Sequence, residues 1–160
     1  MMEDARVVFE TWAQDPEVTR TMTWRPHTDI DVTRSVLRRM IDAWDRNFRF
    51  TYMILNKDTN NALGMIELRP EGHKAEIGYV LARIHWGKGY MTEAAAALRD
   101  WVFQQPEIFR LYATTSVDNI ASQRVMEKIG MTREGLMRRY INHPNVSPEP
   151  VDSYLYAMVR

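Results

Sequence analysis

Hydrophobic residues recur along this chain with two different periods, which together predict its helices and strands. An apolar residue at every third or fourth position is typical of an amphipathic helix, and a short β-branched or alternating run is typical of a strand. Helices are predicted over about Glu3–Ala13, from a cap at Asp29 or Asp31 to Arg46, over Gly89–Gln105 and from Asn119 to Ile129. Strands are predicted over Phe48–Asn56, Ala62–Arg69, Lys74–Ala82, Arg110–Ser116, Thr132–Ile141 and Asp152–Val159.

The helical stripes predict which side chains face the core. The second helix should bury Val32, Val36, Leu37, Met40, Ile41 and Trp44, and the third Met91, Ala94, Ala95, Leu98, Trp101 and Val102. Turn-forming residues at 57–61 and 70–73 separate the first three strands. Helices first, then a meander of strands with two inserted helices, predict an α/β (α+β) sheet domain.

Length and charge limit the functions that this sequence can have. The 160 residues are enough for one domain with its own core, spanning positions 1–160. Acidic and basic residues balance at 21 each, which argues against nucleic-acid and anionic-membrane partners. No apolar run is long enough for a signal peptide or a membrane span, so we expect a cytoplasmic protein.

Side-chain chemistry excludes further classes of site. The sequence has no cysteine, which removes disulfides, thiolate metal sites and a cysteine nucleophile. The four histidines show no spacing typical of metal ligands, so no metal is expected.

The strongest local motif is a strand over 75–81 followed by Gly87-Lys88-Gly89 and a helix. The first N–H groups of a helix lack carbonyl partners and carry partial positive charge, and glycines let main chain approach a phosphate closely. A Walker loop is excluded because Lys88 is followed by Gly89 rather than Ser or Thr. A dinucleotide fingerprint lacks its third glycine. A lone Gly-x-Gly pair is a weak signal, and on the glycines alone a plain tight turn without a ligand is the favoured interpretation.

Six sequence blocks in a fixed order carry a resemblance to a known family. They are Asp15–Arg20, Ala75–Tyr79, Trp86–Ala94, Asp118–Ser122, Glu127–Met131 and Asp152–Tyr156. Together they span nearly the whole chain and make it resemble the GNAT superfamily of N-acetyltransferases, in particular its RimJ/RimL-type branch. The resemblance implies the GNAT fold, a mixed and mostly antiparallel twisted sheet flanked by helices.

The resemblance also implies acetyl-coenzyme A as the acetyl donor. Its pyrophosphate would rest on main-chain N–H groups of the turn, and its pantetheine arm would pair with the end of the preceding strand. A main-chain N–H of that strand would also stabilise the oxyanion that forms during attack. The residues implied in coenzyme binding are Tyr79, Val80, Leu81, Trp86, Gly87, Lys88, Gly89, Tyr90, Met91, Thr92, Asn119 and Ser122.

Three features depart from the family pattern. Ile84 stands where a Gln or Arg is common, and Met126 stands where many relatives carry a tyrosine that protonates the leaving thiolate. The chain also begins almost within the first helix, so the usual first strand of the sheet is expected to be missing. Its loss would leave 48–55 as a bare edge, a surface on which a second copy could pair to form a homodimer.

The catalytic residues are sought among carboxylates and hydroxyls, since an amine acceptor must lose a proton to attack the thioester directly. By resemblance, Glu76 is the first choice of base and Glu67 on the neighbouring strand the second; a surface or ion-paired strand glutamate explains either equally well. Ser122 is implied as the group that protonates the leaving thiolate or hydrogen-bonds its sulfur. Asn119 would both cap its helix and bond the pantetheine arm.

The sequence thus favours an acetyl-coenzyme-A-dependent N-acetyltransferase that acts on a primary amine. The resemblance tilts the acceptor towards a peptide or protein N-terminus, while ribosomal proteins, polyamines, aminoglycosides and amino sugars stay open. The alternative is a coenzyme-A-binding sensor or interaction module without catalysis, which Ile84, Met126 and the missing strand favour.

Overall fold

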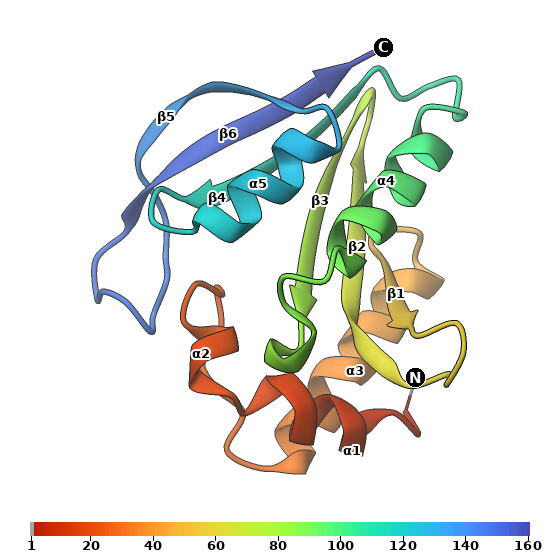
Figure 1. Cartoon of the computed structure of the whole chain (residues 1–160), viewed down its shortest axis with the longest axis vertical. Coiled ribbons are helices and arrows are strands. Elements are labelled where there is room, and N and C mark those ends of the chain that lie inside the picture. Colours follow the sequence, from red (N-terminus) through yellow and green to blue (C-terminus); the bar gives the residue numbers. More distant parts are fainter. Residues whose placement is uncertain (1) are drawn as a thin grey trace.

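A twisted six-stranded sheet with helices on both faces forms the body of the molecule (Figure 1). The computed structural model describes residues 2–160, and its strands follow the order β1-β2-β3-β4-β6-β5. The strands are β1 Phe50–Leu55, β2 Ala62–Glu71, β3 Lys74–Leu81, β4 Arg110–Ser116, β5 Thr132–Ile141 and β6 Val151–Val159. Only β3 and β4 run parallel, and every other neighbouring pair is antiparallel. The expected mixed, mostly antiparallel sheet is confirmed.

The helices come in two groups, before β1 and within the meander. Before β1 lie α1 Ala5–Val8, its π-helical continuation η1 Phe9–Ala13, α2 Pro16–Thr19 and α3 Ile30–Asp45. Within the meander lie the short 3-10 turn η2 Arg83–His85, α4 Tyr90–Val102 and α5 Ile120–Lys128.

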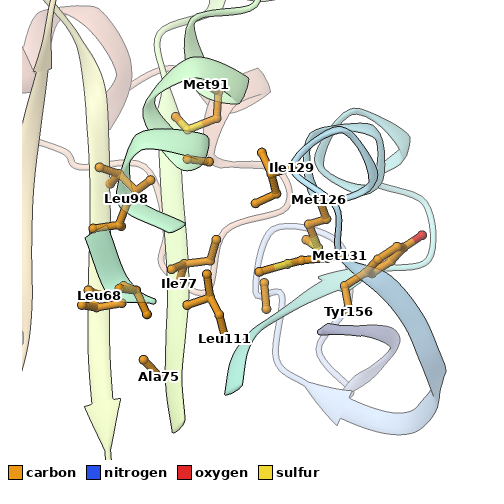
Figure 2. Packing of buried hydrophobic residues seen from close by; sticks show 14 of the residues in the cluster. Leu68, Ala75, Ile77, Met91, Leu98, Leu111, Met126, Ile129, Met131 and Tyr156 are labelled. Atoms are coloured by element: carbon orange, nitrogen blue, oxygen red, sulfur yellow. The ribbon is translucent and has the colours of Figure 1, made fainter. Parts of the chain in front are cut away.

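The larger core lies between the sheet and helices α4 and α5 (Figure 2). Its buried side chains come from one face of β2, β3, β4 and β6 and from the inner stripes of both helices. Those labelled in Figure 2 are Leu68, Ala75, Ile77, Met91, Leu98, Leu111, Met126, Ile129, Met131 and Tyr156. Since side chains alternate along a strand, this packing fixes which residues of β3 face α4 and α5.

A second core covers the opposite face of the sheet, under α1, η1 and α3. It contains Trp12 and Leu37 from the helices and Met65 from β2. Strand β2 is therefore buried on both faces, and all its residues from Leu63 to Leu68 are buried.

Several details differ from the expectations raised by the sequence. Pro70 and Glu71 belong to β2 rather than to the turn, which shrinks to Gly72-His73. Trp101 is 45% exposed because it lies on the flank of the buried α4 stripe. Val32 is also exposed, and the neighbouring Thr33 is buried in its place, with its hydroxyl 2.8 Å from His27 Nδ1. The segments α2 and η2 were not predicted.

Strand β1 forms one edge of the sheet. Within residues 2–160 no strand precedes it, and it pairs only with β2. The expected bare edge around Phe48–Leu55 is thus present, with Phe48 and Leu55 themselves exposed.

Candidate active site

The two halves of the sheet separate between β3 and β4. Only Lys74, Ala75 and Glu76 pair with β4, opposite Arg110, Leu111 and Tyr112. Beyond Glu76 the two parallel strands diverge, and Figure 1 shows their lower ends well apart. A parallel pair that opens in this way leaves main-chain groups of both strands available to a ligand. Helices α4 and α5 follow the two separated strand ends.

The start of α4 is an open glycine turn. Gly87 and Gly89 have φ angles of +73° and +85°, a left-handed conformation that glycine adopts without steric cost. A Cβ added at either glycine would meet no atom within 4 Å, so the space beside the turn is free. In the part of the chain that the structure describes, no side chain caps this helix at Gly89. Its first N–H groups therefore lack a side-chain partner, and the helix dipole adds partial positive charge there.

Neighbouring side chains hold the turn in place. Trp86 Nε1 donates a 2.8 Å hydrogen bond to the carbonyl of Leu81, which folds the turn back onto the end of β3. Arg83 forms an ion pair of 3.1 Å with Asp15, the N-cap of α2. His85 packs edge-on against the ring of Tyr90. Burial lowers the pKa of His85, and the nearby charge of Lys88 lowers it further.

The start of α5 is closed by its own cap. Asn119 Oδ1 accepts a 3.1 Å bond from the N–H of Ser122, and Asn119 Nδ2 donates a 3.0 Å bond to Thr21 Oγ1. Gly130, with φ +91°, ends the helix as the sequence predicts.

The space where β3 and β4 separate, beyond Glu76, is called the opening below. A hydrogen bond crosses it from Tyr79 of β3 to Ser122 of α5. The phenol oxygen of Tyr79 lies 2.8 Å from Ser122 Oγ, and it lies 3.2 Å from the carbonyl oxygen of the same residue. Burial raises the pKa of Tyr79 to about 12, and the hydrogen bond to Ser122 acts in the opposite direction.

The two candidate bases lie on the other face of the sheet and share one arginine. Arg69 Nε donates to Glu67 Oε1, and Arg69 Nη1 donates a 2.8 Å bond to Glu76 Oε2. Burial lowers the pKa of Arg69, but the two carboxylates outweigh it and the pKa is raised overall. The guanidinium lies over Gly78, where a Cβ would approach Arg69 Nη2 to 3.2 Å.

The two carboxylates differ in how far they are already bonded. Glu67 is buried, and both of its oxygens are engaged, since Oε2 accepts from Thr51 and lies 3.5 Å from Arg49 Nη1. Glu76 is half-buried and bonds Arg69 through Oε2, while within residues 2–160 its Oε1 has no bond. Glu76 also lies at the last paired position before β3 and β4 separate.

The structure thus brings the sequence candidates into two groups. Tyr79, the turn and Ser122 surround the opening on the face of α4 and α5, whereas Glu67 and Glu76 lie on the face of α3. The sequence did not identify the side chains of Tyr79 and Arg69. No local signal could have revealed Tyr79, because its partner lies 43 residues away.

The described residues show neither a metal-binding cluster nor a membrane-spanning helix. No cluster of three or more His, Asp or Glu side chains in residues 2–160 could hold a metal ion. The described helices include none that is long and apolar enough to span a bilayer.

Comparison with known proteins gives a consistent result. Residues 2–132 match the model of the acetyltransferase (GNAT) domain. The uncharacterized N-acetyltransferase p20 of Bacillus licheniformis is 31% identical over 99% of this chain and 89% of its own length. A GNAT-family acetyltransferase structure from Bacillus anthracis superimposes with a TM-score of 0.86 at 30% identity, over 99% of this chain and 90% of that one. The ribosomal-protein-serine acetyltransferase of Escherichia coli is 27% identical over 81% of this chain and 71% of its length.

Proposed function

This chain belongs to the GNAT family of acetyltransferases and is an N-acetyltransferase, and from that premise we propose how it holds acetyl-coenzyme A and which amine it acetylates. The donor binds at the start of α4, and the acceptor is the α-amino group of a peptide or protein. The single observation that carries the proposal is the uncapped glycine turn, placed where β3 and β4 separate.

The turn fits the pyrophosphate of the coenzyme. Two left-handed glycines, free space beside both, and a helix start without a side-chain cap leave N–H groups for an anion. We assign the pyrophosphate to the main chain from Gly87 to Thr92, with Lys88 as the cation within the turn. Trp86 orients the turn through its bond to Leu81.

The diverging end of β3 fits the pantetheine arm. Main-chain groups of Tyr79, Val80 and Leu81 on the side of β4 have no strand partner there, so an amide-bearing arm can pair with them. When bound, the coenzyme supplies the acetyl carbonyl that the amine attacks and the thiolate that leaves. Ser122, and Asn119 at the cap of α5, lie across the same opening.

Glu76 is the residue we propose as the base. It stands at the point where the strands separate, and its Oε1 is available to accept a proton from the acceptor amine directly or through water. Glu67 is the second choice because Thr51, Arg49 and Arg69 already bond both of its oxygens. Arg69 positions the two carboxylates on the face of α3.

The acceptor class is supported by a relative rather than by a pocket. The Escherichia coli relative is named for acetylating a serine of a ribosomal protein, and it aligns with most of this chain. We therefore propose an N-terminal peptide segment as the acceptor. The test is thiol release from acetyl-coenzyme A with a panel of N-terminal peptides, a polyamine and an amino sugar. Turnover with peptides supports the proposal, and turnover with only the small amines refutes the acceptor class.

A substitution tests the base. Glu76→Gln should lower kcat about 100-fold, within the range of a general base, and leave the Kd for acetyl-coenzyme A within about twofold. Glu134→Gln is the matched control, because Glu134 is also an ion-paired strand glutamate, bonded to Arg110, but lies on the edge strand β5. A Glu76→Gln variant with the parental rate at every pH would exclude Glu76 as the base.

A further inference from the structure

Tyr79 and Ser122 form a hydrogen-bonded pair across the opening, although the sequence suggests no link between them. The phenol comes from the end of β3 and the serine from the first turn of α5, and their oxygens lie 2.8 Å apart. We propose that Tyr79 is a positioning residue for acetyl transfer: its O–H donates to Ser122 Oγ and so directs the serine O–H to the sulfur of the coenzyme. The inference rests on the proposed function, which places the pantetheine arm in the opening that Ser122 borders.

Counting hydrogens supports this direction of bonding. The phenol and the serine carry one hydrogen each, and three acceptors compete for them: the phenol oxygen, Ser122 Oγ and the Ser122 carbonyl. When Tyr79 donates to the carbonyl at 3.2 Å, Ser122 donates to the phenol oxygen and has no hydrogen left for a ligand. When Tyr79 donates to Oγ, the serine hydrogen is free for the sulfur. A negatively charged sulfur favours the second arrangement, because bonds in such a chain strengthen one another.

The acidity of the phenol decides whether the pair transfers a proton to the thiolate or only donates a hydrogen bond to it. Burial raises the pKa of Tyr79 to about 12, so its O–H stays protonated well above neutral pH. A thiol has an ordinary pKa of about 8.5, so transfer of the phenol proton through Ser122 to the thiolate is strongly unfavourable. The pair therefore stabilises the leaving thiolate by donating hydrogen bonds, while both of its own protons stay in place.

The position of the pair also accounts for the departure at Met126. That residue is 1% exposed and packs in the core between the sheet and α5 (Figure 2), so it offers no polar group to the opening. Ser122 lies one helical turn earlier on α5, on the side that Tyr79 reaches. The phenol that many relatives carry on the helix is supplied here from the strand, through the serine.

The test measures the ionisation of the coenzyme thiol, with no acceptor present. The chain has no cysteine, so bound coenzyme A carries the only thiol in the sample. Its pKa is read from the NMR shift of a ¹³C-labelled carbon next to the sulfur. We expect the parent protein to lower this pKa by about one unit, a tenfold change in the thiolate-to-thiol ratio, as a hydrogen bond to a charged group allows.

Two variants remove the two hydroxyls. Tyr79→Phe keeps the ring, and Ser122→Ala removes the group that would touch the sulfur. Each should return the thiol pKa to within about 0.3 units of its ordinary value, and the double variant should shift it no further, because the pair acts as one unit. In turnover, Tyr79→Phe should lower kcat about tenfold with an unchanged KM for acetyl-coenzyme A.

Tyr156→Phe is the matched control. Tyr156 is buried, and its hydroxyl bonds Glu127 at the other end of α5, 3.1 Å away. This variant should change the melting temperature as Tyr79→Phe does and leave the thiol pKa at the parental value. A Tyr79→Phe protein that is less stable but keeps the lowered thiol pKa overturns the inference, since the contact is then structural only.

Failure of the proposed function is visible separately. A parent protein that does not bind coenzyme A refutes the assignment of the binding turn. A parent protein that binds coenzyme A with an ordinary thiol pKa refutes the role of the pair alone.

Discussion

The two helix starts beside the opening are built in contrasting ways. Helix α5 begins at Asn119, whose side chain accepts from the N–H of Ser122 and also bonds Thr21. Helix α4 begins at Gly89, which has a left-handed backbone and no capping side chain within the described residues. The first start bonds the N–H of Ser122 to its own cap, and the second has no side-chain partner for its first N–H groups and has free space beside its glycines.

This difference is the one expected between a helix start that binds an anion, as proposed for α4, and a helix start that is a stable terminus. An N-cap typically stabilises a protein by about 1 kcal/mol, and α4 forgoes that stabilisation at the place where the phosphates are proposed to bind. The proposed pyrophosphate would then compensate the exposed N–H groups. The contrast predicts that disrupting the glycine turn of α4 acts on binding, whereas removing the Asn119 cap of α5 acts first on stability.

Among the substitutions that test this contrast, Gly89→Val should have the largest effect. A branched side chain at φ +85° strains the backbone and fills the free space beside the turn, so coenzyme affinity should fall at least about tenfold. Isothermal titration calorimetry with coenzyme A measures it. Unchanged affinity would refute the turn as the pyrophosphate site.

Gly72→Val is the control for backbone strain. Gly72 lies in the β2–β3 hairpin at φ +58°, and a Cβ there also meets nothing within 4 Å. The variant should be destabilised and should bind coenzyme A as the parent does.

A smaller effect is expected at the other helix start. Asn119→Ala removes the cap of α5 and should lower the unfolding free energy by about 1 kcal/mol, which is about 2–4 °C in Tm for a domain of this size. Thermal unfolding followed by circular dichroism measures it. Asp29→Ala is the control for the loss of a helix cap away from the site, because it removes a similar cap from α3. It should lower Tm as well and leave coenzyme affinity at the parental value. A parental Tm for Asn119→Ala would mean that the α5 cap is not the stabilising contact proposed here.

The smallest effect concerns pH. The pKa of His85 is lowered by burial and by Lys88, so the imidazole is neutral at pH 7 in the free protein. Phosphate at the neighbouring turn would favour the charged imidazole and raise this pKa in the complex. The affinity for coenzyme A should therefore rise about threefold as the pH falls from the pKa of His85 in the complex to its pKa in the free protein.

The measurement is the Kd of coenzyme A between pH 8 and pH 5.5. The coenzyme phosphates titrate in the same range, so the parent is compared with His85→Asn, which lacks only the imidazole contribution. Identical pH profiles for the two proteins would show that His85 does not sense the phosphates.

Features that depend on neighbouring residues, such as helix ends, could be predicted from the sequence. Contacts between residues far apart in the sequence could not. Helix α5 was predicted almost to the residue, because Asn119 and Gly130 mark its ends by local backbone chemistry. Trp101 was placed in the core wrongly, because a stripe of apolar residues does not reveal how wide the contact with the sheet is.

The same division holds for the candidate site. The glycine turn is a contiguous motif, so it could be recognised from the sequence with the resemblance to support it. The bond between Tyr79 and Ser122 and the bridge of Arg69 between two glutamates depend on strand register and helix placement. Register also decides that Arg69 lies opposite Glu76, which no local pattern encodes.

The three residue pairs that join β3 to β4 have a consequence for folding. The two halves of the sheet share so few main-chain bonds that a ligand lying between them adds to the cohesion of the folded state. A molecule that binds only the folded state stabilises it by mass action, by about 2.7 kcal/mol at one hundred times its Kd. Binding of acetyl-coenzyme A at the proposed site would then link the amount of folded enzyme to the supply of its own acetyl donor.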